Sequence, residues 1–415
     1  MVADLGYGDA GKGTVVDWLC ATEPVTAVIR FNGGAQAAHN VVASDGRHHT
    51  FSQFGAGSFH PNVRTHLSRF VVVDPIALSM EAEHLEALGV PRLWERMSVD
   101  EAALLATPWH RAANRLRETR RGADRHGSCG VGVGEVMAFS LAHPDLAPRV
   151  GDVRSPARLR RAFAAVRDVL TDELGELGYE PPVEAVVDAY TAFGDTVSIV
   201  DADHLGALLS AGRCVFEGAQ GVLLDEWRGW HPFTTWSTTT FANAETLLAE
   251  AGRAGQALRL GVVRTYTTRH GPGPLVTEDA ALTETLPDRH NTDGRWQGAF
   301  RVGHFDAVAH RYAVDVAGGV DGLAVTHLDV ATHRRDLRIC RSYADGTRRI
   351  PPGEFGDLTY QEKLTAALST AAPVLDEVPA DAWPEAISSE LGAPVLLESH
   401  GPTALDKTPR PASPR

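Results

Sequence analysis

Short apolar runs that end in glycine or polar residues recur along the chain and predict buried strands. The expected strands are Val2–Leu5, Thr26–Phe31, Val71–Val73, Arg213–Glu217, Leu258–Tyr266, Asp321–Thr326 and Pro394–Glu398. Between several of them lie stretches whose apolar residues follow helical spacing, so strands and helices alternate. This order predicts an α/β fold with a large, mostly parallel central sheet flanked by helices.

Two kinds of signal place the helices. Asp74 and Pro75 have the side chains expected at the N-cap and first position of a helix, and Gly89 is expected to end that helix. From residue 155 to about residue 211 the apolar spacing is helical. The sequence has no internal repeat and no long linker, which favours a single domain over residues 1–402. Residues 403–415 are rich in proline, serine and arginine and are predicted to be a disordered tail.

The loop after the first apolar run has the composition of a P-loop-like phosphate loop. It reads Gly6-Tyr7-Gly8-Asp9-Ala10-Gly11-Lys12-Gly13-Thr14, and a helix is expected to follow. Glycines allow positive φ and close approach to an anion, which the N-terminus of the helix also attracts. The spacing matches a P-loop through Lys12, but Gly13 stands where a P-loop has its magnesium-binding hydroxyl. The alternative is an ordinary strand-to-helix turn with surface side chains.

Two side chains of this loop are candidates for chemistry. Lysine occurs at three positions of the chain, so its presence at Lys12 suggests a need for a compact ammonium group. Asp9 would repel a phosphate unless it binds a metal ion or takes a proton, which makes it a candidate catalytic group. The run before the loop is shorter than the ~5–6 residues of a usual core strand, and this predicts a truncated start.

Other stretches are rich in glycine or hydroxyl groups, and two of them, residues 32–40 with His39 and residues 218–221, follow predicted strands. The others are residues 127–134 and 230–240. Open α/β sheets bind ligands at such strand ends. A single histidine is more often structural than functional, so His39 is only a candidate on this ground.

Composition narrows the class of protein. The net charge of −14 argues against a general nucleic-acid or anionic-membrane surface, so phosphate groups would be met locally. The four cysteines form no CxxC pair, which disfavours a zinc site or disulfide framework and fits a reducing cytoplasm. No apolar run approaches the ~18 residues of a membrane span, and the start has no signal-peptide pattern.

Taken together, these motifs resemble the adenylosuccinate synthetase family in the same order over nearly the whole chain to Pro402. The matching stretches are Gly8–Thr14, Gly33–Asn40, Phe216–Asp225, Gly261–Arg269, Gly273-Pro274 and Thr277-Glu278. The resemblance implies a GTP- and magnesium-dependent ligase that joins aspartate to carbon 6 of IMP. The 6-oxygen first attacks the γ-phosphate, and the aspartate amine then displaces the phosphate. The resemblance also implies small-molecule substrates and a homodimer.

The resemblance assigns roles to the catalytic candidates. Asp9 takes the N1 proton of the base and, with Ala38, binds magnesium. His39 stabilises charge at the 6-oxygen and the leaving phosphate, and Lys12 neutralises the transferring phosphoryl group. Gln220 orients the base.

The resemblance also implies the residues that bind GTP. Asp329 matches a carboxylate that accepts both guanine donors, whereas His327 replaces the family's lysine beside the base. The full expected set is Gly8, Gly11, Lys12, Gly13, His327, Asp329, Ser399, Gly401 and Pro402.

Departures from the family lie on the acceptor and aspartate sides. The acceptor is expected to contact Gln36, Ser128, Cys129, Gln220 and Thr235. Ser128 and Cys129 replace paired threonines, and the arginine that a partner subunit supplies aligns near Asp145. Aspartate is expected to bind Thr292, Arg295 and Arg301, in a loop where the family has four arginines.

Three alternatives remain open from the sequence. A divergent paralogue would aminate another purine-type nucleotide or nucleoside, for example in specialised metabolism. A catalytically inactive nucleotide-binding regulator would keep the fold without needing the acid-base pair of Asp9 and His39. A P-loop kinase would release no phosphate and would need no aspartate.

Overall fold

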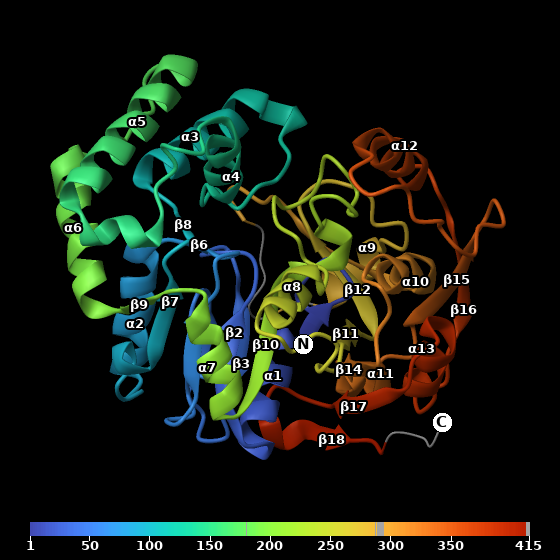
Figure 1. The fold of residues 1–415 in the computed structure, drawn as a ribbon. Helices are drawn as coiled ribbons and strands as arrows, with labels where there is room; N and C mark the ends of the chain where they lie inside the picture. The colour runs from blue at the N-terminus through green and yellow to red at the C-terminus, as the bar shows by residue number, and fades with distance from the viewer. Residues whose placement is uncertain (180, 287, 289–293, 412–415) are drawn as a thin grey trace.

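The computed structural model describes residues 1–179, 181–286, 288 and 294–411. Within them, a central sheet of ten strands has the order β18-β17-β14-β11-β1-β10-β2-β5-β7-β9 (Figure 1). Neighbouring strands are parallel except for β17 and β18, so the predicted large, mostly parallel sheet is confirmed. The strands are β1 (Val2–Asp4), β2 (Val25–Arg30), β5 (Arg64–Leu67), β7 (Met97–Asp100), β9 (Ser198–Val200), β10 (Arg213–Gly221), β11 (Leu260–Arg264), β14 (Gly322–Thr326), β17 (Val395–Ser399) and β18 (Lys407–Pro409).

The first strand, β1, has three residues and lies in the middle of the central sheet. Val2 is in register with Glu217 of β10 on one side and with Leu260 of β11 on the other. All three residues of β1 are buried. Three residues therefore suffice for a core strand here because both neighbours are longer and are supplied by distant parts of the chain.

Eight further strands lie outside the central sheet. A second sheet has the order β12-β13-β15-β16, and two small pairs join β3 with β4 and β6 with β8. Their bounds are β3 (His39–Val42), β4 (His48–Phe51), β6 (Val72–Val73), β8 (Leu104–Leu105), β12 (Tyr266–His270), β13 (Phe300–Asp306), β15 (Arg338–Tyr343) and β16 (Pro373–Glu377).

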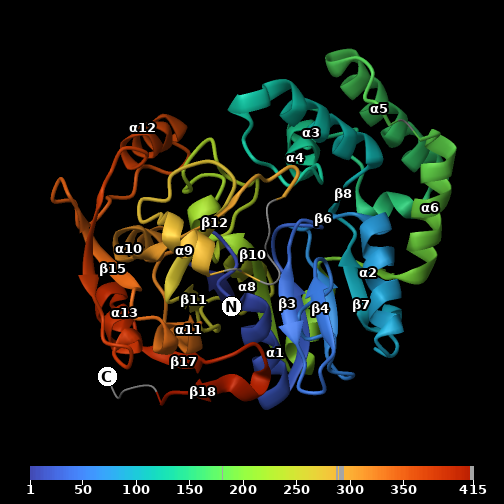
Figure 2. The ribbon, with the colours of Figure 1, turned by 180° about the vertical axis from the view of Figure 1, so that it is seen from behind.

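The helices gather at the two ends of the central sheet as well as on its faces. Figures 1 and 2 show α3 to α6 beyond the edge that carries β7 and β9, and α10, α12 and α13 beside the second sheet at the opposite end. The helices are α1 (Lys12–Thr22), α2 (Pro75–Ala87), α3 (Pro108–Arg121), α4 (Val133–Ala142), α5 (Pro156–Leu174), α6 (Val183–Thr196), α7 (Asp203–Ala211), α8 (Ala242–Glu250), α9 (Ala280–Thr285), α10 (Ala307–Val316), α11 (Leu328–His333), α12 (Leu358–Leu368) and α13 (Trp383–Leu391).

Local sequence signals placed some of these elements correctly. The Asp74 side chain accepts a hydrogen bond from the Ala77 amide and caps α2, whose first residue is Pro75. Gly89 follows the helix with a φ of 78°, a backbone conformation that favours glycine. The predicted start and end of this helix are confirmed.

Three expectations from the sequence were wrong. The helical stretch from residue 155 to residue 211 is broken by β9, a short strand at the edge of the sheet. Residues 218–221 continue β10 instead of forming a glycine turn. The expected tail of residues 403–415 is ordered where the structure describes it, because β18 pairs antiparallel with β17; residues 412–415 lie outside the described part.

Over the described residues, no helix is both long enough and apolar enough to cross a membrane.

We expect deletion of residues 403–415 to lower the melting temperature, because β17 would lose its ladder of hydrogen bonds with β18. A loss of a few kcal/mol would correspond to about 5 °C or more in a thermal-unfolding measurement. Deletion of residues 411–415, which keeps β18 and Arg410, is the control. Equal melting temperatures for the two deletions would contradict a structural role for β18.

Candidate functional site

A cavity of about 1220 Å³ lies at the carboxyl ends of four strands of the central sheet. Its walls include the loop after β1, Gln220 at the end of β10, Thr326 at the end of β14 and Ser399 at the end of β17. Parallel strands bring their carboxyl ends to one edge of a sheet, where open α/β proteins bind ligands. The topology therefore explains why segments far apart in the sequence share one cavity.

Most residues expected to bind substrates line this cavity. They are Gly8, Asp9, Gly11, Lys12, Gly13, Gln36, Ala38, His39, Ser128, Cys129, Gln220, Thr235, His327, Asp329, Ser399, Gly401 and Pro402. Arg295 and Arg301 are not among the lining residues, and Thr292 lies outside the described residues.

The buried carboxylate of Asp4 organises the phosphate loop, and the sequence reading missed it. One of its oxygens accepts hydrogen bonds from the amides of Gly6 at 2.8 Å and Gly8 at 3.3 Å. The other oxygen accepts from the amide of Ala10 at 2.9 Å and from the ammonium group of Lys12 at 3.2 Å. These loop amides therefore bind an internal anion. The remaining amides for a bound phosphate are those at the start of α1, which have no partner within the helix.

Asp9 projects from this loop into the cavity. Its φ of 59° is unusual for a residue other than glycine, and its backbone carbonyl accepts a hydrogen bond from Arg264 at 3.2 Å. The carboxylate lies 3.4 Å from Nε2 of His270, the last residue of β12. Burial alone would raise the pKa of Asp9, but His270 and the nearby cations hold it below its usual value. Asp9 is therefore ionised and able to accept a proton or bind a cation. The sequence reading gave His270 no role.

His39, the first residue of β3, is held by Glu217 of β10 in the central sheet. Nδ1 of His39 lies 2.6 Å from one oxygen of Glu217, whose other oxygen accepts from the Ala56 amide at 3.0 Å. Burial lowers the pKa of His39 to about 4, although the Glu217 carboxylate opposes that shift. The imidazole is thus neutral in the free protein and donates its Nδ1 proton to Glu217. Its Nε2 is buried without a partner among the described residues and is left for a ligand.

Two glutamine side chains on the cavity wall also lack partners among the described residues. Both polar atoms of the Gln36 side chain, and Oε1 of Gln220, are buried and unpaired. Gln220 has a φ of 57°, so the backbone of β10 turns at this residue, one position before the strand ends. Buried polar atoms without partners are costly, so these positions favour a polar ligand that supplies the missing bonds.

The far end of the cavity is built from the loops after β14 and β17. The Asp329 side chain lies there, one residue into α11. Nδ1 of His327 lies 2.9 Å from the Thr326 hydroxyl, and the two form a hydrogen bond. Burial keeps the pKa of His327 well below its usual value. The hydroxyl of Thr14 in α1 donates to the carbonyl of Pro402 at 2.7 Å. The phosphate loop is thereby tied directly to this end of the cavity.

The third glycine-rich loop forms another wall and is held by α3. The side-chain amide nitrogen of Asn114 donates to the Ser128 hydroxyl at 2.9 Å. A carboxylate oxygen of Glu118 accepts a hydrogen bond from the backbone amide of Gly127 at 2.9 Å. Burial raises the pKa of the Cys129 thiol, so Cys129 contributes a neutral side chain. The Ser128 hydroxyl is therefore bonded to the side chain of Asn114 in this structure.

The two arginines expected to bind aspartate make other contacts. Arg301 donates to the carbonyls of Gly271 and Gly273 and pairs with Glu278 at 2.6 Å. Arg295 is exposed, and its guanidinium lies 5.1 Å from the ring of Trp296. Neither side chain faces the cavity in this structure.

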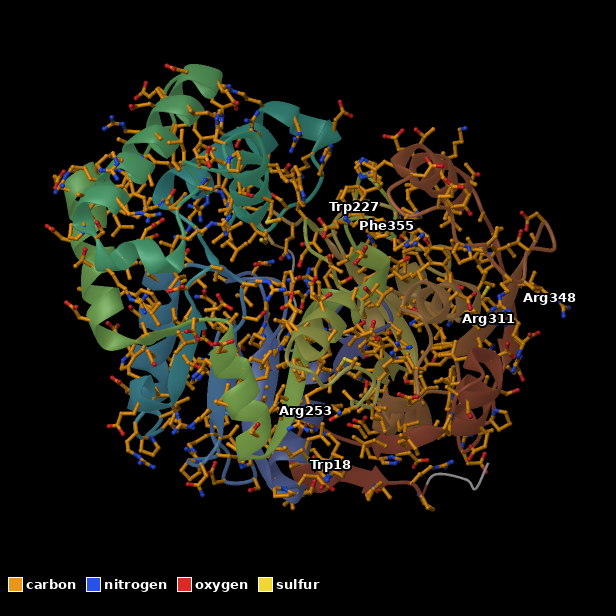
Figure 3. All side chains as sticks on the ribbon, in the orientation of Figure 1. Trp18, Trp227, Arg253, Arg311, Arg348 and Phe355 are labelled. Carbon is orange, nitrogen blue, oxygen red and sulfur yellow. The ribbon has the colours of Figure 1, made fainter. Side chains whose placement is uncertain are left out.

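Aromatic side chains lie at the rim of the cavity. Trp227 lines the cavity and packs on Phe355, with ring centroids 5.7 Å apart (Figure 3). Phe355 is 71% exposed, and the guanidinium of Arg228 lies 5.3 Å from its ring. The loop between β15 and α12 thus reaches the rim of the cavity.

The sequence matches one known family along its length. The family model described as adenylosuccinate synthetase matches residues 1–403. The adenylosuccinate synthetase of Alkalilimnicola ehrlichii is 34% identical over 95% of this chain and 94% of its own length. That of Vibrio cholerae is 33% identical over 96% of this chain and 90% of its own length.

Two solved structures have a similar fold. A fully ligated adenylosuccinate synthetase from Plasmodium falciparum has a TM-score of 0.84, with 21% identity over 99% of both chains. The succinoaminodeoxyadenylate synthetase of cyanophage S-2L, bound to dGMP and dATP, has a TM-score of 0.63, with 20% identity over 99% of this chain and 95% of its own.

We expect Asp4→Asn to destabilise the protein strongly, because the buried ammonium of Lys12 would lose its counter-ion and face an amide. Removal of one partner of a buried ion pair costs about 3–5 kcal/mol, which urea unfolding would measure. Asp17→Asn, which removes a buried carboxylate of α1 that accepts from His60, is the control and should cost less. Equal losses for the two variants would contradict the central role of Asp4.

Proposed function

Because the chain belongs to the adenylosuccinate synthetase family, we propose that it is a GTP-dependent ligase that joins aspartate to IMP or a close analogue. The reaction passes through a phosphorylated 6-oxo intermediate. The main support for this proposal is that Asp9, Lys12 and His39 line the same cavity as the unpaired polar atoms of Gln36 and Gln220.

In the first step Asp9 accepts the N1 proton of the oxopurine, and the 6-oxygen becomes the nucleophile. It forms a bond to the γ-phosphorus of GTP while the bond to the β-phosphate oxygen breaks and GDP leaves. Lys12 offsets the negative charge of the transferring group. An anion beside His39 raises its proton affinity, so Nε2 can donate to the 6-oxygen or the new phosphate. Gln220 holds the base by its amide.

In the second step the aspartate amine attacks carbon 6, the carbon–oxygen bond breaks, and inorganic phosphate leaves. The amine loses a proton as the new bond forms. The proposal keeps Thr292, Arg295 and Arg301 as the aspartate ligands. Arg301 must release Glu278 to reach a bound dicarboxylate.

The cavity fits a magnesium ion that is bound mainly by substrate. Magnesium needs only one or two carboxylates when phosphates and waters complete its octahedron. Asp9, with the backbone carbonyl of Ala38, would hold it at the phosphate loop. Within the described residues no cluster of three or more acidic, histidine or cysteine side chains forms a separate metal site. When bound, the ion withdraws charge from the phosphates of GTP.

The substrates are assigned to different walls of the cavity. GTP binds along Gly8–Gly13, with its base between Asp329 and the wall of Ser399, Gly401 and Pro402. The acceptor lies at Gln36, Ser128, Cys129 and Thr235. We treat residues 1–402 as one domain and expect a cytoplasmic homodimer that binds neither nucleic acid nor membrane.

The direct test incubates the purified protein with GTP, magnesium, aspartate and IMP and follows phosphate release and product mass. Phosphate release that requires both IMP and aspartate, with a product equal to IMP plus aspartate minus water, is the expected result. Release without aspartate would indicate a kinase or phosphatase activity, and GTP binding without turnover would indicate a regulator. Either outcome would overturn the proposal.

We expect Asp9→Asn and His39→Asn to fold normally and to lose about 100-fold or more in turnover, because each acts on a proton or charge at the reacting atoms. Steady-state kinetics would measure the loss, and circular dichroism would check the fold. Asp45→Asn, at a half-exposed carboxylate paired with Arg47, is the control and should keep wild-type turnover. Near-wild-type turnover of either site variant would exclude this mechanism.

We expect Asp329→Ala to reduce the preference for GTP over ATP. The Asp329 carboxylate would accept hydrogen bonds from two N–H donors of guanine. Leaving one such donor unpaired in a closed pocket costs about 1–3 kcal/mol, or roughly 5- to 150-fold in kcat/KM. Measurement of kcat/KM for both triphosphates tests this. If the wild-type protein already uses ATP as well as GTP, the assignment of Asp329 fails.

A further inference from the structure

Lys407 is a buried cation at the end of the cavity that contains Asp329. It begins β18 and is 7% exposed, whereas Lys363 in α12 is exposed. Its ammonium group donates to the carbonyl of Gly401 at 2.7 Å and to the carbonyl of Thr403 at 2.9 Å. A buried ammonium needs such acceptors, so these two bonds fix its position.

The two carbonyls bracket Pro402, which lines the cavity. Pro402 is also held from the other side, since its own carbonyl accepts from Thr14 at 2.7 Å. The turn is closed by Asp406, one of whose oxygens accepts from the amide and the hydroxyl of Thr403 at 2.8 Å and 2.7 Å. A Cβ atom at Gly401 would lie 2.7 Å from the Asp406 side chain, so Asp406 packs directly against this turn. Lys407 therefore secures a wall that α1 contacts on its other side.

Lys407 also acts on the polar groups of the same end of the cavity. Burial lowers the pKa of Lys407 to about 8, and the carboxylates of Asp406, Asp17 and Asp329 oppose that shift. Conversely, the charge of Lys407 contributes to the low pKa of His327, after burial and Arg264.

We propose that Lys407 is a positioning residue for guanine recognition: it holds the Gly401–Thr403 wall of the cavity. This inference rests on the proposed function, because it takes the ligand to be a guanine nucleotide. Lys407 does not itself contact the nucleotide. It acts through Pro402, against which the base would rest.

The test compares Lys407→Met with Lys363→Met, a matched removal of an exposed lysine. Isothermal titration calorimetry with GDP gives the dissociation constant of each variant and of the wild-type protein. We expect a dissociation constant about tenfold higher for Lys407→Met and an unchanged one for Lys363→Met. Lys407→Arg, which keeps the charge and hydrogen-bond donors, should recover part of the affinity.

Kinetics separate this role from a general loss of structure. For Lys407→Met the KM for GTP should rise and the GTP-to-ATP ratio of kcat/KM should fall, while the KM for IMP stays within about threefold. Wild-type GDP affinity in Lys407→Met, or an equal rise of both KM values, would overturn the role of Lys407. Absence of GDP binding by the wild-type protein would overturn the proposed function itself.

A second measurement covers the case in which Lys407→Met does not fold. The wild-type protein is acetylated with limiting acetic anhydride, with and without GDP, and each lysine is followed by mass spectrometry. GDP should slow acetylation of Lys407 and leave that of Lys363 unchanged, because the nucleotide stabilises the wall above Lys407. Equal rates at Lys407 with and without GDP would overturn the inference.

Discussion

The buried carboxylate of Asp4 fixes the loop from which Asp9 and Lys12 project. An aspartate in the middle of a sheet is stable only when its oxygens are fully bonded, and three loop amides and one ammonium meet that need. The same bonds force the chain to turn back over the end of β1. The position of the loop is thus determined by an internal anion before any phosphate arrives.

The parallel sheet then brings the other groups to that loop. β10 delivers Glu217 and Gln220, β14 leads to Asp329, and β17 leads to Pro402. Gln220, Asp329 and Pro402 lie near or just beyond a strand end, where the backbone is rigid on one side and free to turn on the other, whereas Glu217 lies within β10. The positive φ of Asp9, Gln220 and His327 marks three of these turning points. Such strained conformations are typical of functional sites.

Features set by local sequence could be predicted, and features set by distant partners could not. Spacing of glycines revealed the phosphate loop, and Asp74 with Pro75 revealed the start of α2. β9 was missed because three half-exposed residues carry no periodic signal. β18 was missed because Lys407-Thr408-Pro409 reads as an unstructured tail until β17 supplies the pairing.

The same distinction holds within the site. Asp9, Lys12 and His39 stand in motifs, so their positions in the cavity followed from the sequence and from family resemblance. Glu217 lies in the matched stretch Phe216–Asp225, but its contact with His39, 178 positions away, could not be predicted from that motif. His270 and Lys407 lie outside the matched stretches and act through contacts with residues 261 and 6 positions away. Arg301 donates to backbone carbonyls in this structure, and those contacts could not be predicted from the sequence.

The central place of β1 bears on how the protein is made. Its neighbours β10 and β11 begin at Arg213 and Leu260, so a chain growing from its N-terminus carries an unpaired first strand for much of its synthesis. At about 5–20 residues per second, the segment between β1 and β10 takes about 10 s or longer to emerge from the ribosome. The last wall of the cavity waits for β18, which follows every other strand of the central sheet along the chain. The nascent chain therefore cannot bind nucleotide until β18 has been synthesised, and until β10 and β11 emerge the first strand is a surface for chaperones to shield.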